Sequence, residues 1–359
     1  MENMVNDTLN SFYKNKKIFL TGHTGFKGSW MLAWLYSMGC IVKGYALPPE
    51  NKYDLYNVIT GNDICQSIIA DIREKEKLKK ELLEFQPDII FHLAAQPLVR
   101  YSYHDPIKTF EVNSMGTVYI LDALRSLEKQ CSIIVVTTDK VYLNKDSDHL
   151  YKETDLLGGY DPYSASKAAA EIITDSYRNS FFNIDKFNSH QKAIASARAG
   201  NVIGGGDWNQ DRIIPDIVKA LQKNETIILR NPGSIRPWQF VLDPISGYLL
   251  LGKKLHENHS QFSGAWNFGP PQNDNLTVKE IVEFSIKCWG KGKYETPRLM
   301  NQPHEAKLLK LDANKAVHEL NWKPKYNSKK TIENTILWYK QSAMDQKDYT
   351  YKQLNDYTN

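Results

Sequence analysis

The chain has 359 residues, 42% of them apolar, which suits one large two-lobed domain or two domains that share an interface. The formal net charge is only +4 and acidic and basic side chains are interspersed, so the composition argues against a nucleic-acid partner. A polar start and the lack of a long apolar run argue against a signal peptide and a membrane span. The four cysteines lack CxxC or metal-like spacing, so we expect a cytoplasmic protein with reduced thiols and no metal site.

Apolar strands alternate with amphipathic helices over the first 200 residues. The predicted strands are Lys17–Leu20, Cys40–Tyr45, Ser67–Ala70, Asp88–Leu93, Cys131–Thr137 and Ala193–Ala197. Helical patterns lie between them, for example at residues 75–85 and 110–127. This alternation predicts an α/β fold, a doubly wound parallel sheet of the Rossmann type with helices on both faces.

A glycine-rich turn, GHTGFKG at residues 22–28, follows the first predicted strand with the spacing GxxGxxG. Glycines permit a sharp turn, let backbone N–H groups approach a diphosphate and allow close packing of helix on strand. The helix that follows then directs its positive end at the phosphates. The predicted cofactor contacts in this turn are Gly22, Thr24, Gly25, Phe26, Lys27 and Gly28. The alternative interpretation is a plain tight turn.

Small and polar residues follow the third and fourth predicted strands. Asp71 and Ile72 come after the third strand, where they can contact an adenine. Ala94, Ala95 and Gln96 come after the fourth strand and are predicted to lie beside the cofactor, with Gln96 also contacting the substrate. The second strand ends in GYAL at 44–47, which supplies neither the usual acid for NAD nor a basic cluster for NADP. We expect NAD, although these residues alone leave the choice open.

Two further segments carry candidate catalytic groups. Tyr163 and Lys167 stand four residues apart, so on a helix they share one face, and a neighbouring ammonium lowers the pKa of a phenol. The phenolate can take a proton from a sugar hydroxyl while a hydride leaves the same carbon. Thr138, Asp139 and Lys140 follow the fifth strand, at the sheet edge where ligands bind. Thr138 can hydrogen-bond the reacting hydroxyl, and elimination of water needs an acid and a base such as the other two.

The sequence becomes richer in loops and prolines after about residue 200. Short strands are predicted at 226–229 and 238–242, and helices at 213–222 and 278–289. We predict an NAD-binding Rossmann domain at residues 1–200, to which 238–265 return. A smaller C-terminal substrate-binding lobe comprises 201–237 and 266–345, and a polar, frayed tail comprises 346–359.

Longer strings of residues resemble the extended short-chain dehydrogenases/reductases, and among these most closely the CDP-glucose 4,6-dehydratases. The strings are HTGFKGSW at 23–30, AQPLVR at 95–100, GGYDPY at 158–163, RAGNVIGGGDW at 198–208, IRPWQ at 235–239 and PHEA at 303–306. The similarity extends over nearly the whole chain. One departure is Val141, where a cysteine is expected in close relatives.

The resemblance implies a tightly held NAD used catalytically and conversion of CDP-glucose to CDP-4-dehydro-6-deoxyglucose by a protein that forms homodimers or higher oligomers. Thr138 and Tyr163 then act at the C4 hydroxyl, and Lys167 holds the cofactor ribose. Asp139 protonates the departing C6 hydroxyl. Lys140 stands where related dTDP-glucose 4,6-dehydratases carry a glutamate, and it removes the C5 proton. These roles require a protonated Asp139 and a neutral Lys140.

The diphosphate of the substrate needs cations and amides, and the planar fork of arginine can bind two of its oxygens at once. The candidates for substrate contact are Asn201, Arg212, Arg230 and Arg236, followed by His304 and Glu305. Each arginine can equally be an ordinary surface residue. Trp208 and Trp238 are expected in the core rather than as stacking platforms.

Two other functions remain open. A nucleotide-sugar 4-epimerase would use Thr138, Tyr163 and Lys167 but has no need for Asp139 and Lys140. A non-catalytic NAD-sensing or scaffolding protein can share the fold, but such proteins commonly lose the tyrosine or the lysine.

Overall fold

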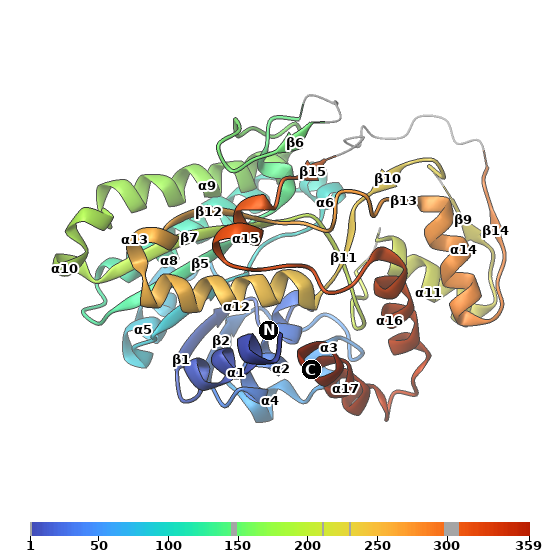
Figure 1. Ribbon diagram of the computed structural model, residues 1–359, viewed down its shortest axis with the longest axis horizontal. Helices are drawn as coiled ribbons and strands as arrows, with labels where there is room; N and C mark the ends of the chain where they lie inside the picture. Colours follow the sequence, from blue (N-terminus) through green and yellow to red (C-terminus); the bar gives the residue numbers. More distant parts are fainter. Residues whose placement is uncertain (1, 145–148, 210–211, 230, 298–308) are drawn as a thin grey trace.

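The computed structural model describes residues 2–144, 149–209, 212–229, 231–297 and 309–359. A seven-stranded sheet forms its centre, with the strand order β12-β7-β5-β4-β1-β2-β3 and parallel pairing throughout (Figure 1). The strands are β1 (Lys17–Thr21), β2 (Ile41–Ala46), β3 (Gln66–Ile69), β4 (Ile89–His92), β5 (Cys131–Val136), β7 (Lys192–Ala199) and β12 (Gly264–Phe268). The expected Rossmann-type fold is confirmed, and the chain changes direction across the sheet between β1 and β4, where such folds bind ligands.

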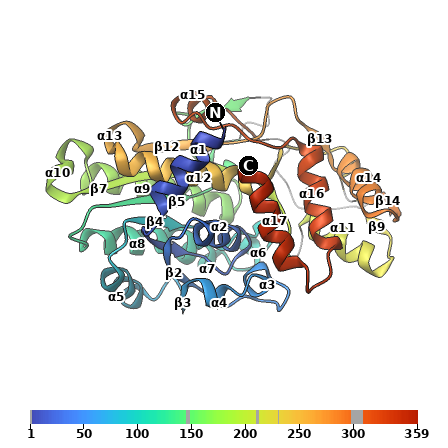
Figure 2. The same cartoon turned by 60° about the horizontal axis from the view of Figure 1, so that its bottom comes forward.

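Helices cover both faces of the sheet because successive strand residues point to opposite sides. In β1, Ile18 and Leu20 enter one apolar cluster, whereas Phe19 enters the other. The first face carries α1 (Glu2–Tyr13), α2 (Phe26–Ser37) and α12 (Leu242–Glu257), and the second carries α5 (Lys75–Phe85), α8 (Gly116–Arg125) and α9 (Pro162–Ser180) (Figure 2). Every strand predicted in the first half is present, whereas β12 was not predicted.

Short helices connect these elements. They are α3 (Leu55–Val58), α4 (Gly61–Ile64), α6 (Val99–His104), α7 (Pro106–Phe110), η2 (Asp139–Val141), η3 (Ile184–Lys186), α10 (Phe187–His190) and α13 (His259–Phe262). The helix predicted at 110–127 is interrupted, because a π-helical turn, η1 (Glu111–Met115), separates α7 from α8. None of the helices in the described ranges combines the length and the apolar character that crossing a membrane requires.

The C-terminal part packs small strand pairs and helices against one end of the sheet. Its helices are α11 (Ile213–Lys223), α14 (Val278–Trp289), α15 (Asn314–Glu319) and α16 (Ser328–Lys340). The strand pairs join β8 (Asn201–Ile203) to β11 (Trp238–Phe240), β9 (Ile227–Ile228) to β14 (Tyr294–Glu295), β10 (Ile235–Arg236) to β13 (Leu276–Thr277), and β6 (Leu150–Tyr151) to β15 (Lys310–Leu311). One apolar cluster runs from the sheet face into α11, α14 and α16. The helices predicted at 213–222 and 278–289 are confirmed, and the division into two lobes stays a prediction.

The polar C-terminal segment forms a packed helix, α17 (Gln346–Thr358), so the expectation of a frayed tail was wrong. Leu354 and Tyr357 are buried, and the Tyr357 hydroxyl donates a hydrogen bond of 2.8 Å to Asp243 Oδ1 in α12. Trp338 Nε1 in α16 donates to Thr350 Oγ1 at 2.8 Å. The segment is ordered because its few inward residues make these specific contacts, which its polar composition does not reveal.

Candidate active site

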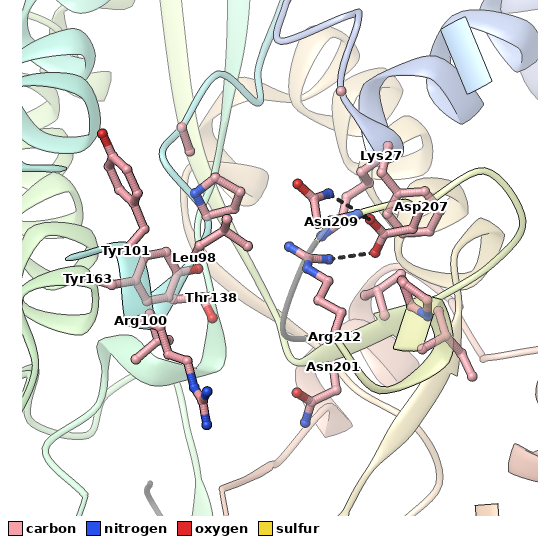
Figure 3. A pocket seen from close by; sticks show the side chains of 18 of the residues that line it. Lys27, Leu98, Arg100, Tyr101, Thr138, Tyr163, Asn201, Asp207, Asn209 and Arg212 are labelled. Atoms are coloured by element: carbon pink, nitrogen blue, oxygen red, sulfur yellow. Dashed lines mark hydrogen bonds and ion pairs between the residues drawn. The ribbon is translucent and has the colours of Figure 1, made fainter. Parts of the chain in front are cut away.

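A cavity of about 1800 Å³ opens at the carboxyl ends of β1, β4, β5 and β7. One wall carries Thr138 and Tyr163, and the facing wall carries Asn201, Asp207 and Arg212 (Figure 3). All five predicted catalytic residues line this cavity, as do the six predicted contacts of the glycine turn. The structure therefore brings the two sets of sequence candidates to one place.

The glycine turn is too tight for side chains at two of its positions. Gly22 has a φ of +75°, and a Cβ atom there would lie 2.7 Å from the backbone nitrogen of Ala94. A Cβ on Gly28 would lie 2.0 Å from the carbonyl oxygen of Gly22. Because α2 begins at Phe26, its free N–H groups face the cavity across this turn. The turn therefore fits a dinucleotide diphosphate.

We expect Gly28→Ala to destabilise the protein by about 2 kcal/mol and to weaken dinucleotide binding at least about tenfold, because the added methyl overlaps the turn. Urea unfolding and fluorescence titration measure the two effects. Gly233→Ala is the control, since a Cβ on Gly233 meets no atom within 4 Å. Equal behaviour of the two variants would contradict the role given to the close contact.

The segment after β5 places an acid and a base side by side. Thr138 caps the 3₁₀ turn η2, and its hydroxyl donates a hydrogen bond of 2.8 Å to Asp139 Oδ1. Lys140 Nζ lies 3.7 Å from the same Asp139 oxygen. The Asp139 side chain is 3% exposed and that of Lys140 is 27% exposed, so the amine is the more accessible partner. The two groups form an ion pair at the cavity wall.

Tyr163 and Lys167 lie in the first turns of α9 and are both buried. Asp161 caps this helix by accepting a hydrogen bond from Ser164 N, and Pro162 occupies its first position. Lys167 Nζ donates to the carbonyl oxygen of Val136, at the end of β5, at 3.2 Å. The helix therefore holds the phenol and the amine on the face that meets β5.

The expected lowering of the Tyr163 pKa by Lys167 is not what the structure shows. Burial raises the pKa of Tyr163 to about 12; the Thr138 hydroxyl opposes this by hydrogen bonding, and the Asp139 charge adds to it. Burial also lowers the pKa of Lys167 to about 8, opposed by Glu171. The cost of burying a charge exceeds the effect of its neighbours at both groups.

A buried polar network behind the catalytic groups was not predicted. Arg198 in β7 forms an ion pair of 3.0 Å with Glu171, one helical turn after Lys167. Glu171 also accepts a hydrogen bond from the hydroxyl of Thr137, which precedes the catalytic loop. Arg198 Nη1 donates to the hydroxyl of Tyr142, just beyond that loop, at 2.7 Å. The network ties β5, α9 and the loop together, and only the tertiary structure reveals it.

The residues predicted after β3 and β4 separate into two groups. Asp71, Ile72, Ala94 and Ala95 line the cavity. Gln96 does not, because its side-chain amide turns inward and donates to Leu98 O at 3.1 Å and to Thr109 Oγ1 at 3.0 Å. The predicted contacts of Gln96 with cofactor and substrate therefore need correction: its position is structural.

The facing wall holds some of the predicted substrate contacts. Asn201 and Arg212 line the cavity, and Arg212 Nη1 forms an ion pair of 3.0 Å with Asp207 Oδ2. As expected, Trp238 lies within the apolar core and Trp208 packs against it. Both side chains also border the cavity. Arg230, His304, Glu305 and the side chain of Arg236 lie outside the described residues.

The chain matches the family model described as GDP-mannose 4,6 dehydratase over residues 19–335. It belongs to this family. The match spans the glycine turn, the loop at 138–140 and the Tyr163–Lys167 pair, so the residues that line the cavity lie within the matched range.

Relatives of this chain include a CDP-glucose 4,6-dehydratase from Salmonella typhimurium. The two sequences are 46% identical over 330 residues, which are 92% of each chain. A CDP-paratose 2-epimerase from Salmonella typhi is 25% identical over 90% of this chain and 98% of its own. Among solved structures, DesIV, a dTDP-glucose 4,6-dehydratase from Streptomyces venezuelae with NAD and TYD bound, is 22% identical with a TM-score of 0.75, covering 90% of this chain and 96% of its own. That structural likeness supports the fold.

Proposed function

We propose that the protein is an NAD-dependent hydro-lyase that converts CDP-glucose to CDP-4-dehydro-6-deoxyglucose and water. The observation that carries the proposal is the Asp139–Lys140 pair beside Tyr163 in one cavity, since elimination needs an acid and a base next to the site of oxidation. The 46% identity to a CDP-glucose 4,6-dehydratase supports the same substrate. A 4-epimerase would have no use for this pair.

Bound NAD would supply the hydride acceptor for C4, the hydride donor for C6 and a positive charge beside Tyr163. The glycine turn and α2 hold its diphosphate, and Lys167 orients its ribose. Tyr163, assisted by the hydroxyl of Thr138, removes the proton of the C4 hydroxyl. Because burial raises the pKa of Tyr163 to about 12, the phenol must first lose its own proton to solvent before it can accept the C4 proton, and positive charge beside the phenol favours that loss.

Elimination then depends on where one proton resides in the Asp139–Lys140 pair. Transfer of that proton from the Lys140 ammonium to the Asp139 carboxylate converts the ion pair into a neutral amine and a neutral acid. The amine removes the C5 proton, which the C4 ketone acidifies, and the acid protonates the departing C6 hydroxyl. The 3.7 Å separation of Lys140 Nζ and Asp139 Oδ1 is longer than a hydrogen bond, so this exchange requires the two groups to move closer.

The substrate diphosphate meets the facing wall in this proposal. Asn201 and Arg212 line the cavity there, and Arg230, Arg236, His304 and Glu305 remain predicted contacts. Homodimer or higher assembly and a cytoplasmic location also stay predictions.

The test is incubation with CDP-, dTDP-, GDP- and UDP-glucose, with and without added NAD, followed by mass measurement of the products. We expect loss of one water from CDP-glucose alone. A product of unchanged mass with inverted C4 would replace the proposal by the epimerase function, and loss of water from another donor would overturn the assignment of the nucleotide.

A further inference from the structure

Lys27 stands in the glycine turn but extends away from it. The residue lies in the first turn of α2, is half-buried, and lines the cavity near Asp207 and Arg212 (Figure 3). Its Nζ donates a hydrogen bond of 3.4 Å to the hydroxyl of Tyr248 in α12 and lies 5.6 Å from the centre of that ring. Its amine therefore reaches beyond the backbone cradle toward the catalytic groups.

Three charged groups influence the pKa of this amine. The positive charges of Arg212, before α11, and Lys167, on α9, lower the pKa of Lys27. The negative charge of Asp139, after β5, raises it. Within the described ranges no carboxylate lies within 4.0 Å of Lys27 Nζ, whereas Asp139 is paired with Lys140 and Asp207 with Arg212. Lys27 thus lines the cavity without a carboxylate partner of its own in the described ranges, and an anionic ligand would supply that partner.

We propose that Lys27 and Arg212 together form a site for the diphosphate of the nucleotide sugar, and that Lys27 takes up a proton when this diphosphate binds. The inference rests on the proposed nucleotide-sugar substrate and adds a residue of the cofactor turn to its binding site. A guanidinium stays charged at all working pH values, so of the two groups only the amine can exchange a proton.

The direction of this proton exchange follows from the surroundings of Lys27. Burial lowers the pKa of Lys27 to about 7, with Arg212 and Lys167 acting in the same direction. At pH 8, above this pKa, the neutral form of the amine therefore predominates in the free protein. The negative charge of a diphosphate raises the pKa of a nearby amine, so binding at pH 8 draws a proton from the buffer.

Isothermal titration with CDP at pH 8, in Tris and in HEPES, measures the proton uptake from the difference between the two heats. CDP lacks the sugar and cannot turn over, and its phosphate is fully ionised at this pH, since the second phosphate pKa is about 6. We expect net uptake of up to about one proton per site. Lys27→Arg is expected to bind CDP without uptake, and Lys27→Met about tenfold more weakly and without uptake.

Lys219→Met is the matched control, because it removes the same charge from helix α11 at a residue that is not part of the cavity lining; Lys219 Nζ donates to the carbonyl oxygen of Trp208. It should keep the wild-type uptake. Absence of uptake in the wild type, or its survival in Lys27→Arg, overturns the proposal. Uptake on titration with NAD but not CDP assigns Lys27 to the cofactor diphosphate instead.

If CDP does not bind, dTDP, GDP and UDP are titrated, and failure of all four overturns the diphosphate site. The readout is independent of turnover. Proton-linked CDP binding by a protein that leaves CDP-glucose unchanged would refute the proposed reaction alone, and turnover without proton uptake would refute the role of Lys27 alone.

Discussion

Tyr163→Phe is expected to lower kcat by about 10³-fold while NAD still binds. The substitution removes one hydroxyl and keeps the buried ring, so the packing of α9 against β5 is retained. Without that hydroxyl the C4 proton has no acceptor next to Thr138. Steady-state kinetics on CDP-glucose and fluorescence titration with NAD measure the two quantities.

Tyr13→Phe separates this effect from the general loss of a buried hydroxyl. Tyr13 is fully buried, its hydroxyl donates to Leu249 O at 2.7 Å, and neither residue lines the cavity. We expect this variant to lose about 1 kcal/mol of stability and to keep its kcat. Near-wild-type turnover by Tyr163→Phe would reject the assignment of Tyr163 as the proton acceptor.

Lys140→Ala is expected to permit oxidation at C4 but to slow the loss of water by roughly 10³-fold. Removal of the amine leaves C5 without a base, whereas Thr138, Tyr163 and Lys167 are unchanged. Exchange of the C5 hydrogen with deuterated solvent, followed by mass spectrometry, should disappear in this variant, and a 4-keto sugar that retains its C6 hydroxyl should accumulate in single-turnover experiments.

Lys140→Arg distinguishes a base from a structural partner. Arginine keeps the positive charge and can pair with Asp139, but it does not lose its proton at working pH. The base role therefore predicts that Arg fails as Ala does, with Asp139 still paired. Restored water loss in Lys140→Arg, or normal product formation by Lys140→Ala, would refute the role proposed for this lysine.

The parts of the site that could be predicted from sequence are those with a local signal. The turn at 22–28 follows an apolar strand and precedes a helix, and Tyr163 and Lys167 share a helix face by spacing alone. The strand β12 and the helix α17 were missed because contacts distant in sequence stabilise them, such as the pairing of β12 with β7.

The contacts and charges of single residues were harder to predict. Gln96 follows a strand, as ligand-binding residues do, yet Asn113 of the π-helical turn holds its backbone through two hydrogen bonds, and its amide turns away from the cavity. The pKa of Tyr163 depends on how deeply α9 packs against the sheet, and a YxxxK pattern carries no information about that depth.

The apolar cluster beneath the sheet continues without a break into α11, α14, α16 and α17. A rigid rotation of the C-terminal part about a hinge would tear this shared interior apart and expose buried tryptophans such as Trp238 and Trp338 to water. We therefore expect the C-terminal part to stay fixed relative to the sheet when a ligand binds, and grafting this part onto another Rossmann domain would require redesign of the common interior.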